Sequence, residues 1–286
     1  MKRPDGRLVK GIEPMQRITP YIMKTRNDAM NMFEDSFDCS AMDAYIQEKA
    51  DQGIKMNYMT IMIAAVVRLI ALRPQLNRFV INKRIYARHK IWVSFSIHHT
   101  LREDDPGTDL KLCFEGTETI LEIADKVNKA IEAETIHYKD TQANDLDKFL
   151  DNLMNHLPSW VLAGIINTLM WMDKHNIMPK AIVELSPFHT SFFLTNLKSL
   201  GINHVFHHVY NFGTTGLFIA IGKEKMVPVV EKKKLVTKKH MGFGLVADER
   251  FCDGLYFALS LRQLKKFLMD PKQLETPLEK KVEDVE

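Results

Sequence analysis

Three carboxylates and an arginine stand together near the end of the chain, between Asp248 and Gly254. The apolar run from Met241 to Asp248 predicts a strand before them. Apolar residues then recur at helical spacing from Leu255 to Leu268, which predicts a helix after them. Carboxylates at a strand-to-helix turn are suited to acid–base chemistry. The simpler alternative is an acidic helix start that is capped by Asp253.

The turn resembles the carboxy-terminal motif of the CoA-dependent acyltransferases. This superfamily includes the catalytic domain of the dihydrolipoamide acyltransferases and chloramphenicol acetyltransferase, and its motif is His-x-x-x-Asp-Gly followed by an apolar helix. Asp253 and Gly254 match the motif, Arg250 resembles the dihydrolipoamide form and Cys252 resembles the chloramphenicol form. Glu249 stands in the place of the histidine, and this departure bears directly on activity.

Further matches follow in the family's order, at Pro14 to Ile18, Arg73 to Asn77, Phe193 to Ile202 and Phe218 to Gly222. The resemblance therefore covers most of the chain. It implies an α/β fold with a mixed sheet covered by helices. We expect an acyltransferase-like domain over residues 1–271, with a helical insertion at about 140–178, and a charged tail over 272–286.

The resemblance also implies roles for individual residues. In the family, the histidine takes a proton from the thiol of CoA or from the acceptor. The aspartate holds the local structure through an arginine near the amino terminus, and a serine hydroxyl stabilises the oxyanion. Carried over by position, the catalytic set is Glu249, Asp253 and Thr195. Its supporting residues are Arg17, with Arg26 as the alternative, together with Asn196 and Gly254.

Glu249 is a good base only if its surroundings raise its pKa. The reference pKa of glutamate is about 4.3, against about 6.5 for histidine. Burial beside Asp248 or Asp253 would raise that value, whereas an ion pair with Arg250 would lower it. Other histidines remain as alternatives if the fold brings one near the threonine, although surface or hydrogen-bonded histidines are the simpler interpretation; they are His98, His99, His189, His204, His207 and His208.

Composition sets wider limits. The chain has 286 residues, 45% of them hydrophobic, and a net charge of +3, so no preference for nucleic acid follows. Three scattered cysteines and no apolar stretch near the start favour a reducing cytoplasm without a signal peptide. We expect no metal, since the histidine cluster has no ligand partners at suitable spacing. We expect no lipoyl domain before the catalytic domain.

Three functions agree with these observations. The first is an active acyltransferase that uses acyl-CoA and forms a homotrimer, because the family builds its site between subunits. The second is a pseudoenzyme that keeps the trimeric fold to bind a CoA-like ligand or a protein. The third is a scaffold that acts through the helical insertion. We favour the first.

The insertion contains the most unusual helix of the sequence. Trp160 to Met172 is apolar nearly all round but shorter than a membrane span. We expect it to be buried in the domain or at a subunit contact. The alternative is a hairpin that docks a partner or touches a membrane, which would be favoured if both tryptophans were exposed on one surface.

Other elements follow from periodicity and turn residues. The pattern predicts helices at Met15 to Met32 and Asn57 to Leu72, and a helix opened by the capping box of Thr119 and Glu122. It predicts strands at several places, including 181–185 and 205–211, and fraying after Pro271.

Overall fold

A computed structural model describes residues 3–100, 102, 107–141 and 157–286. Its main sheet has six strands in the order β2-β9-β8-β7-β5-β6. β5–β7 and β7–β8 pair in parallel, whereas the pairs β2–β9, β8–β9 and β5–β6 are antiparallel. The predicted mixed sheet is therefore confirmed. The strands are β2 (Met30–Asp38), β5 (Ile91–Ile97), β6 (Thr108–Phe114), β7 (Phe192–Asn196), β8 (Leu217–Glu231) and β9 (Lys234–Asp248).

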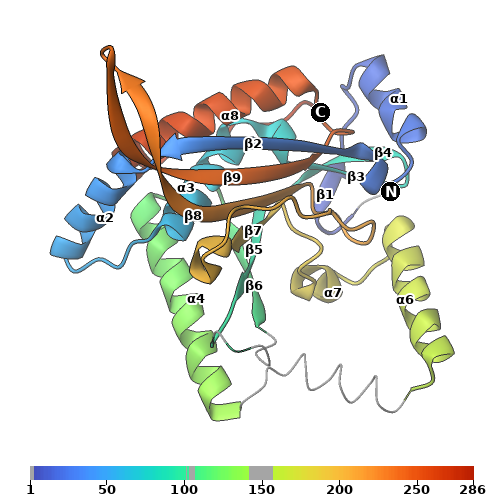
Figure 1. Ribbon diagram of the computed structural model, residues 1–286. Helices are drawn as coiled ribbons and strands as arrows, with labels where there is room; N and C mark the ends of the chain where they lie inside the picture. Colours follow the sequence, from blue (N-terminus) through green and yellow to red (C-terminus); the bar gives the residue numbers. More distant parts are fainter. Residues whose placement is uncertain (1–2, 101, 103–106, 142–156) are drawn as a thin grey trace.

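Helices cover one face of this sheet (Figure 1). α3 is the most apolar of them and is buried along nearly its whole length, as predicted for Asn57 to Leu72. Its side chains join one large core with apolar residues from the other helices and from the sheet. The covering helices are α2 (Ser40–Asp51), α3 (Tyr58–Leu72), α4 (Ile120–Thr141) and α8 (Gly254–Met269).

Smaller elements surround this core. A second sheet of three antiparallel strands has the order β1-β4-β3, with β1 at Gly6–Leu8, β3 at Arg78–Ile81 and β4 at Arg84–Arg88. The remaining helices are α1 (Pro14–Ile22), α6 (Ser159–Lys174) and α7 (Lys180–Leu185). Short 3-10 turns occupy Asn27–Ala29, Pro74–Asn77, Leu197–Leu200 and Pro271–Glu275.

The second face of the main sheet carries an extended segment of the chain that includes His204 and Val209. Glycines make room for it, because a Cβ at Gly222 would lie 2.3 Å from the backbone nitrogen of His204 and one at Gly242 2.6 Å from its Nδ1 atom. Val209 continues this cover by packing with Phe218. The segment therefore lies across the strands instead of pairing with them.

Several predicted elements are wrong. Residues 205–211 form no strand, because their alternating side chains pack onto the face of a sheet whose own strands already pair. Residues 181–185 belong to α7, which is a helix. The helix predicted from Met15 to Met32 ends at Ile22, since β2 begins at Met30 and pairs with β9 from that residue on. The capping box of Thr119 and Glu122 is confirmed by reciprocal hydrogen bonds.

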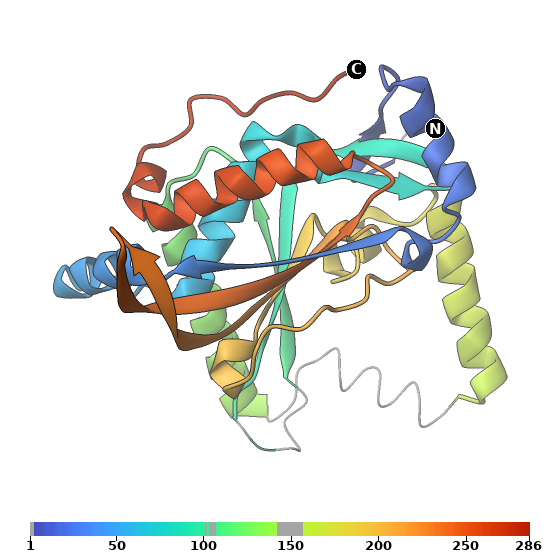
Figure 2. The ribbon, with the colours of Figure 1, turned by 45° about the horizontal axis from the view of Figure 1, so that its top comes forward.

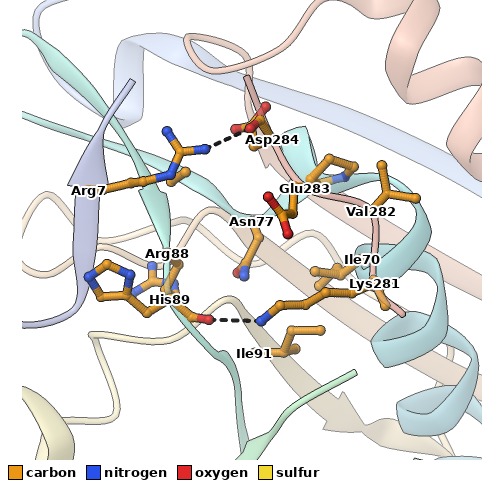
Figure 3. A pocket seen from close by; sticks show the side chains of 13 residues that line it. Arg7, Ile70, Asn77, Arg88, His89, Ile91, Lys281, Val282, Glu283 and Asp284 are labelled. Carbon is orange, nitrogen blue, oxygen red and sulfur yellow. Dashed lines mark hydrogen bonds between the residues drawn. The ribbon is translucent and has the colours of Figure 1, made fainter. Parts of the chain in front are cut away.

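The charged tail does not fray. Asp284 accepts two 2.6 Å hydrogen bonds from Arg78, and its backbone oxygen accepts one from Arg7. Figure 3 shows how the tail closes a cavity of about 230 Å³ against β1, β4 and α3, with Lys281 donating to the backbone oxygen of His89. Arg78, which is buried, and Arg7 supply partners that composition alone could not indicate.

The apolar part of α6, the described helix of the insertion, is largely exposed. Trp160 is 78% accessible and Trp171 is 54% accessible. Burial of Trp160 to Met172 in the domain, one of our two expectations, is therefore wrong. Figures 1 and 2 both show α6 at the edge of the molecule, away from the helices that cover the sheet. Among the described residues, no helix is long and apolar enough to cross a membrane.

Candidate functional site

The acidic turn has the predicted strand-to-helix form, and its centre is a buried ion cluster. Asp248 ends β9 and is fully buried. Its two carboxylate oxygens accept hydrogen bonds of 2.8 and 2.7 Å from the Nε and Nη2 atoms of Arg250. Arg26 approaches the same carboxylate at 3.5 Å. Arg250 therefore binds Asp248 and forms no ion pair with Glu249.

The backbone of Glu249 is held by a hydrogen bond, whereas its side chain has no partner among the described residues. Its N–H donates to the backbone oxygen of Ala29 at 2.9 Å, which ties the turn to the start of β2. The residue is partly exposed, and within the described part of the chain its carboxylate has no hydrogen bond or ion pair. A carboxylate in this state is free to meet a substrate or a second subunit.

Asp253 is the N-cap of α8. Its side chain accepts a 2.7 Å hydrogen bond from the backbone N–H of Tyr256, and the residue is exposed. Within this chain, Asp253 therefore caps the helix, which is the simpler of the two interpretations of the sequence. Gly254 follows as the first residue of the helix, and a Cβ there would meet nothing within 4 Å. Its support of the site is therefore not steric within this chain.

Of the two candidate supporting arginines, Arg26 lies at the acidic turn, where it approaches Asp248, and Arg17 does not reach it. Arg17 is exposed on α1, and none of its contacts reaches the acidic turn. Arg26 is buried and donates to the backbone oxygens of Tyr210 at 2.6 Å and Gly213 at 2.9 Å. Burial lowers its pKa from the ordinary value of arginine, which the nearby Asp248 carboxylate opposes. Arg26 thus ties the acidic turn to the segment on the second face of the sheet.

Thr195 lies on that second face. In β7, Phe192 and Leu194 join the main core, whereas Phe193 packs against Phe218 on the opposite side. Because side chains alternate along a strand, the Thr195 side chain shares the side of Phe193. Its neighbour Asn196, expected as support, has a buried Oδ1 without a hydrogen-bond partner among the described residues.

The structure keeps Thr195 and Glu249 apart within one chain. Thr195 pairs with Ala220, which pairs with Gly244, so Thr195 is two strands away from β9. Glu249 lies five residues beyond Gly244. With a rise of about 3.3 Å per residue and a strand spacing of about 4.8 Å, the two Cα atoms are roughly 19 Å apart. A site that uses both residues therefore needs two chains.

One histidine lies on the same sheet face as the threonine. The His207 ring stacks on Phe218 with ring centroids 4.4 Å apart, and Phe218 pairs with Phe193, two residues before Thr195. Its Nε2 atom is buried and has no hydrogen-bond partner among the described residues. Burial lowers the pKa of His207, and the charge of His208 adds to that effect. The ring therefore favours its neutral form, which accepts a proton.

Two other candidate histidines have structural contacts. His189 is buried between the Ser186 hydroxyl at 2.8 Å and the Asp173 carboxylate at 3.3 Å, and burial lowers its pKa. His99 stacks on Tyr138. No group of three or more potential ligands that could hold a metal occurs within the described ranges.

Sequence comparison gives a match that contains both Thr195 and the acidic turn. Residues 188–276 match the family model of the 2-oxoacid dehydrogenases acyltransferase catalytic domain. The dihydrolipoyllysine-residue acetyltransferase component of the acetoin cleaving system of Bacillus subtilis (strain 168) is 32% identical over 85 residues, which are 30% of this chain. The chain spans only 21% of the length of that relative.

Structural comparison covers nearly the whole chain. A probable dihydrolipoamide acetyltransferase from Listeria monocytogenes 4b F2365 has a TM-score of 0.58 and 14% identity over 93% of this chain and 97% of that one. The dihydrolipoamide acetyltransferase of Azotobacter vinelandii, investigated for the catalytic roles of a serine, a histidine and an asparagine, has a TM-score of 0.57 and 13% identity over 91% and 88%. The fold is thus the one that these acyltransferase cores share, as the resemblance implied.

Proposed function

We propose that this chain, whose fold and carboxy-terminal sequence are those of the 2-oxoacid dehydrogenase acyltransferase catalytic domains, moves an acyl group between CoA and an acceptor. The observation that carries the proposal is the family match over residues 188–276, because this segment holds both Thr195 and the turn from Glu249 to Gly254. The acid–base and oxyanion positions of the family thus fall within its best-matched part.

The active form we propose is a homotrimer. Glu249 of the partner subunit would face Thr195 across a subunit contact, since the two residues are roughly 19 Å apart within one chain. The partly exposed and uncommitted carboxylate of Glu249 supports such a shared site. Light scattering tests the assembly, and a stable monomer in solution would refute the shared site.

The proposed reaction needs one base and one hydrogen-bond donor. Glu249 takes the proton from the acceptor, whose heteroatom then attacks the thioester carbonyl carbon of acyl-CoA. The Thr195 hydroxyl donates a hydrogen bond to the oxyanion that forms. When the carbon–sulfur bond breaks, the proton returns from Glu249 to the CoA sulfur. Asp253 and Arg26 position the turn and take no part in the proton transfer.

His207 is the second candidate for the base. It lies on the same sheet face as Thr195, and its Nε2 atom is buried without a partner among the described residues. Because burial lowers its pKa, turnover through a neutral His207 would persist somewhat below the ordinary histidine pKa of about 6.5. Protonation at still lower pH would then abolish it.

The test is a screen of acyl-CoA thioesters for release of the free CoA thiol, followed by variants. We expect Glu249→Gln to reduce turnover by about 10²- to 10⁴-fold while the assembly survives. Glu132→Gln, an exposed glutamate on α4, is the matched control and should leave turnover unchanged. A loss with His207→Gln alone would transfer the role of the base to that residue.

Glu249→His separates the enzyme from the pseudoenzyme alternative. If the unaltered chain is inactive with every thioester and this substitution creates activity, the natural chain is a pseudoenzyme and our proposal is wrong. If the unaltered chain is active, the same substitution is expected to retain part of that activity.

We also propose a reducing, cytoplasmic setting. Cys39, Cys113 and Cys252 are all free thiols. Burial raises the pKa of each of them, which keeps the reactive thiolate form rare.

A further inference from the structure

α6 is a helix whose exposed surface is almost entirely apolar. No charged residue occurs between Ser159 and Met172. Trp160 and Trp171 are eleven positions apart, which is close to three helical turns, so both face the same side. They are 78% and 54% accessible, and Ile166 on a neighbouring side of the helix is 48% accessible. Both tryptophans thus stand on one apolar surface that the described chain leaves uncovered.

Within the described residues, hydrogen bonds and an ion pair anchor the helix near its carboxy-terminal end. Asp173 is buried, where it accepts a 2.8 Å hydrogen bond from Arg3 and lies 3.3 Å from His189. Asn176 continues this anchor by donating to the Tyr86 hydroxyl at 3.1 Å. The apolar part before Asp173 therefore extends away from a fixed base, as Figures 1 and 2 show.

α1 adds a second exposed apolar face on the same side of the molecule. Met15, Ile18 and Ile22 follow helical spacing and are 71%, 47% and 69% accessible. Figures 1 and 2 both show α1 and α6 at the same edge of the molecule, on either side of the β3–β4 hairpin. Two helices at one edge of the molecule thus carry exposed apolar side chains.

A cavity with a basic rim lies between α6 and the β3–β4 hairpin. Its volume is about 460 Å³, and its lining includes Met170 from α6 and three exposed lysines, Lys24, Lys83 and Lys174. None of these lysines has an ion pair within the described ranges, while Lys83 lies 5.0 Å from the ring of Tyr21. Uncompensated ammonium groups next to exposed apolar helices are complementary to a surface that is apolar inside and anionic outside.

We infer that this face, formed by α1, α6 and the three lysines, docks onto an anionic lipid surface. Exposed apolar side chains lie on more than one side of α6. A lipid interface that surrounds the helix would cover these side chains better than a flat protein surface would. A sixteen-residue helix is about 24 Å long, which is shorter than the roughly 30 Å hydrocarbon core. The helix therefore lies in the interface, with the lysines against the headgroup phosphates.

The experiment is vesicle binding by the full chain. Cosedimentation is measured with vesicles of phosphatidylcholine alone and with vesicles that also contain phosphatidylglycerol. Two of the three tryptophans lie on α6, so insertion should shift the tryptophan fluorescence to shorter wavelength. We expect binding to the anionic vesicles and at least about tenfold weaker binding to the neutral ones.

Two sets of variants define the surface. Trp160→Ser with Ile166→Ser should weaken vesicle binding by at least about tenfold. Lys24→Glu with Lys174→Glu should remove the preference for anionic vesicles. The matched control is Val230→Ser with Leu235→Ser at the tip of the β8–β9 hairpin, where both residues are more than 70% accessible. This control should bind as the unaltered chain does.

Three results would overturn the inference. The first is absence of binding to the anionic vesicles. The second is loss of binding in the hairpin control but not in the α6 variant, which would assign lipid contact to the hairpin. The third is a change of oligomeric state in the α6 variant without any vesicle binding, which would make a second copy of this chain the occupant.

Discussion

Removal of the charge of Asp248 should destabilise the protein strongly. Asp248 is 0% exposed, and its arginine partners Arg26 and Arg250 are 3% and 4% exposed. Asp248→Asn keeps the shape and an oxygen that can accept the 3.2 Å hydrogen bond from the backbone N–H of Arg250. It leaves two buried arginines without their counter-charge, for which we expect a loss of about 3–5 kcal/mol in the free energy of unfolding.

The assay is equilibrium urea unfolding at a fixed protein concentration and neutral pH. The matched control is Asp253→Asn, because asparagine caps a helix about as well as aspartate, so its change should be within about 0.5 kcal/mol. The double variant Asp248→Asn with Arg250→Gln should recover part of the loss, since one uncompensated charge is removed with its partner. A loss below about 1 kcal/mol for Asp248→Asn would refute the argument that this carboxylate neutralises two buried arginines.

Three further predictions concern stability. Gly213 has a φ of +83°, and a Cβ there would lie 2.2 Å from a backbone oxygen. Gly213→Ala should therefore lower the free energy of unfolding by more than about 2 kcal/mol. An effect no larger than that of Gly254→Ala, where a Cβ would meet no atom within 4 Å, would contradict this. Burial lowers the pKa of Lys111 to about 7. Because the unfolded chain then binds more protons between about pH 7 and 10.4, stability should rise with pH across that window, and urea titrations at pH 7 and 9 should show a rise that Lys111→Met lacks. Asp284→Asn should lower the unfolding midpoint in the same assay, since it weakens a pair that is nearly buried with Arg78; an unchanged midpoint would mean that the tail contributes nothing to stability.

Much of the fold could be predicted from local patterns. The strand, acidic turn and helix around Glu249 were predicted correctly, because each depends on a run of neighbouring residues. The same holds for α3, whose apolar residues leave no polar side to face water, and for the capping box of Thr119. The family resemblance then supplied the arrangement of the sheet, which periodicity alone does not determine.

Some errors arose where a pattern fits two environments. The alternation in residues 205–211 is typical of a strand, yet the segment lies across the sheet because Gly222 and Gly242 leave room for its backbone. The run at 181–185 is short, and short apolar runs do not separate helix from strand. In both places, contacts with distant residues decided the conformation.

The sequence determined by itself which residue types stand in the motif: Glu249 in place of the family's histidine, Asp253 as a cap, and Thr195 on a strand. Only the tertiary structure decided that Arg26 instead of Arg17 joins the acidic turn, and that Thr195 and Glu249 stay roughly 19 Å apart in one chain. The physical reason is that helix, strand and cap depend on neighbours within a few positions of the chain. Ion-pair partners, exposure and distances between strands depend instead on how distant segments pack.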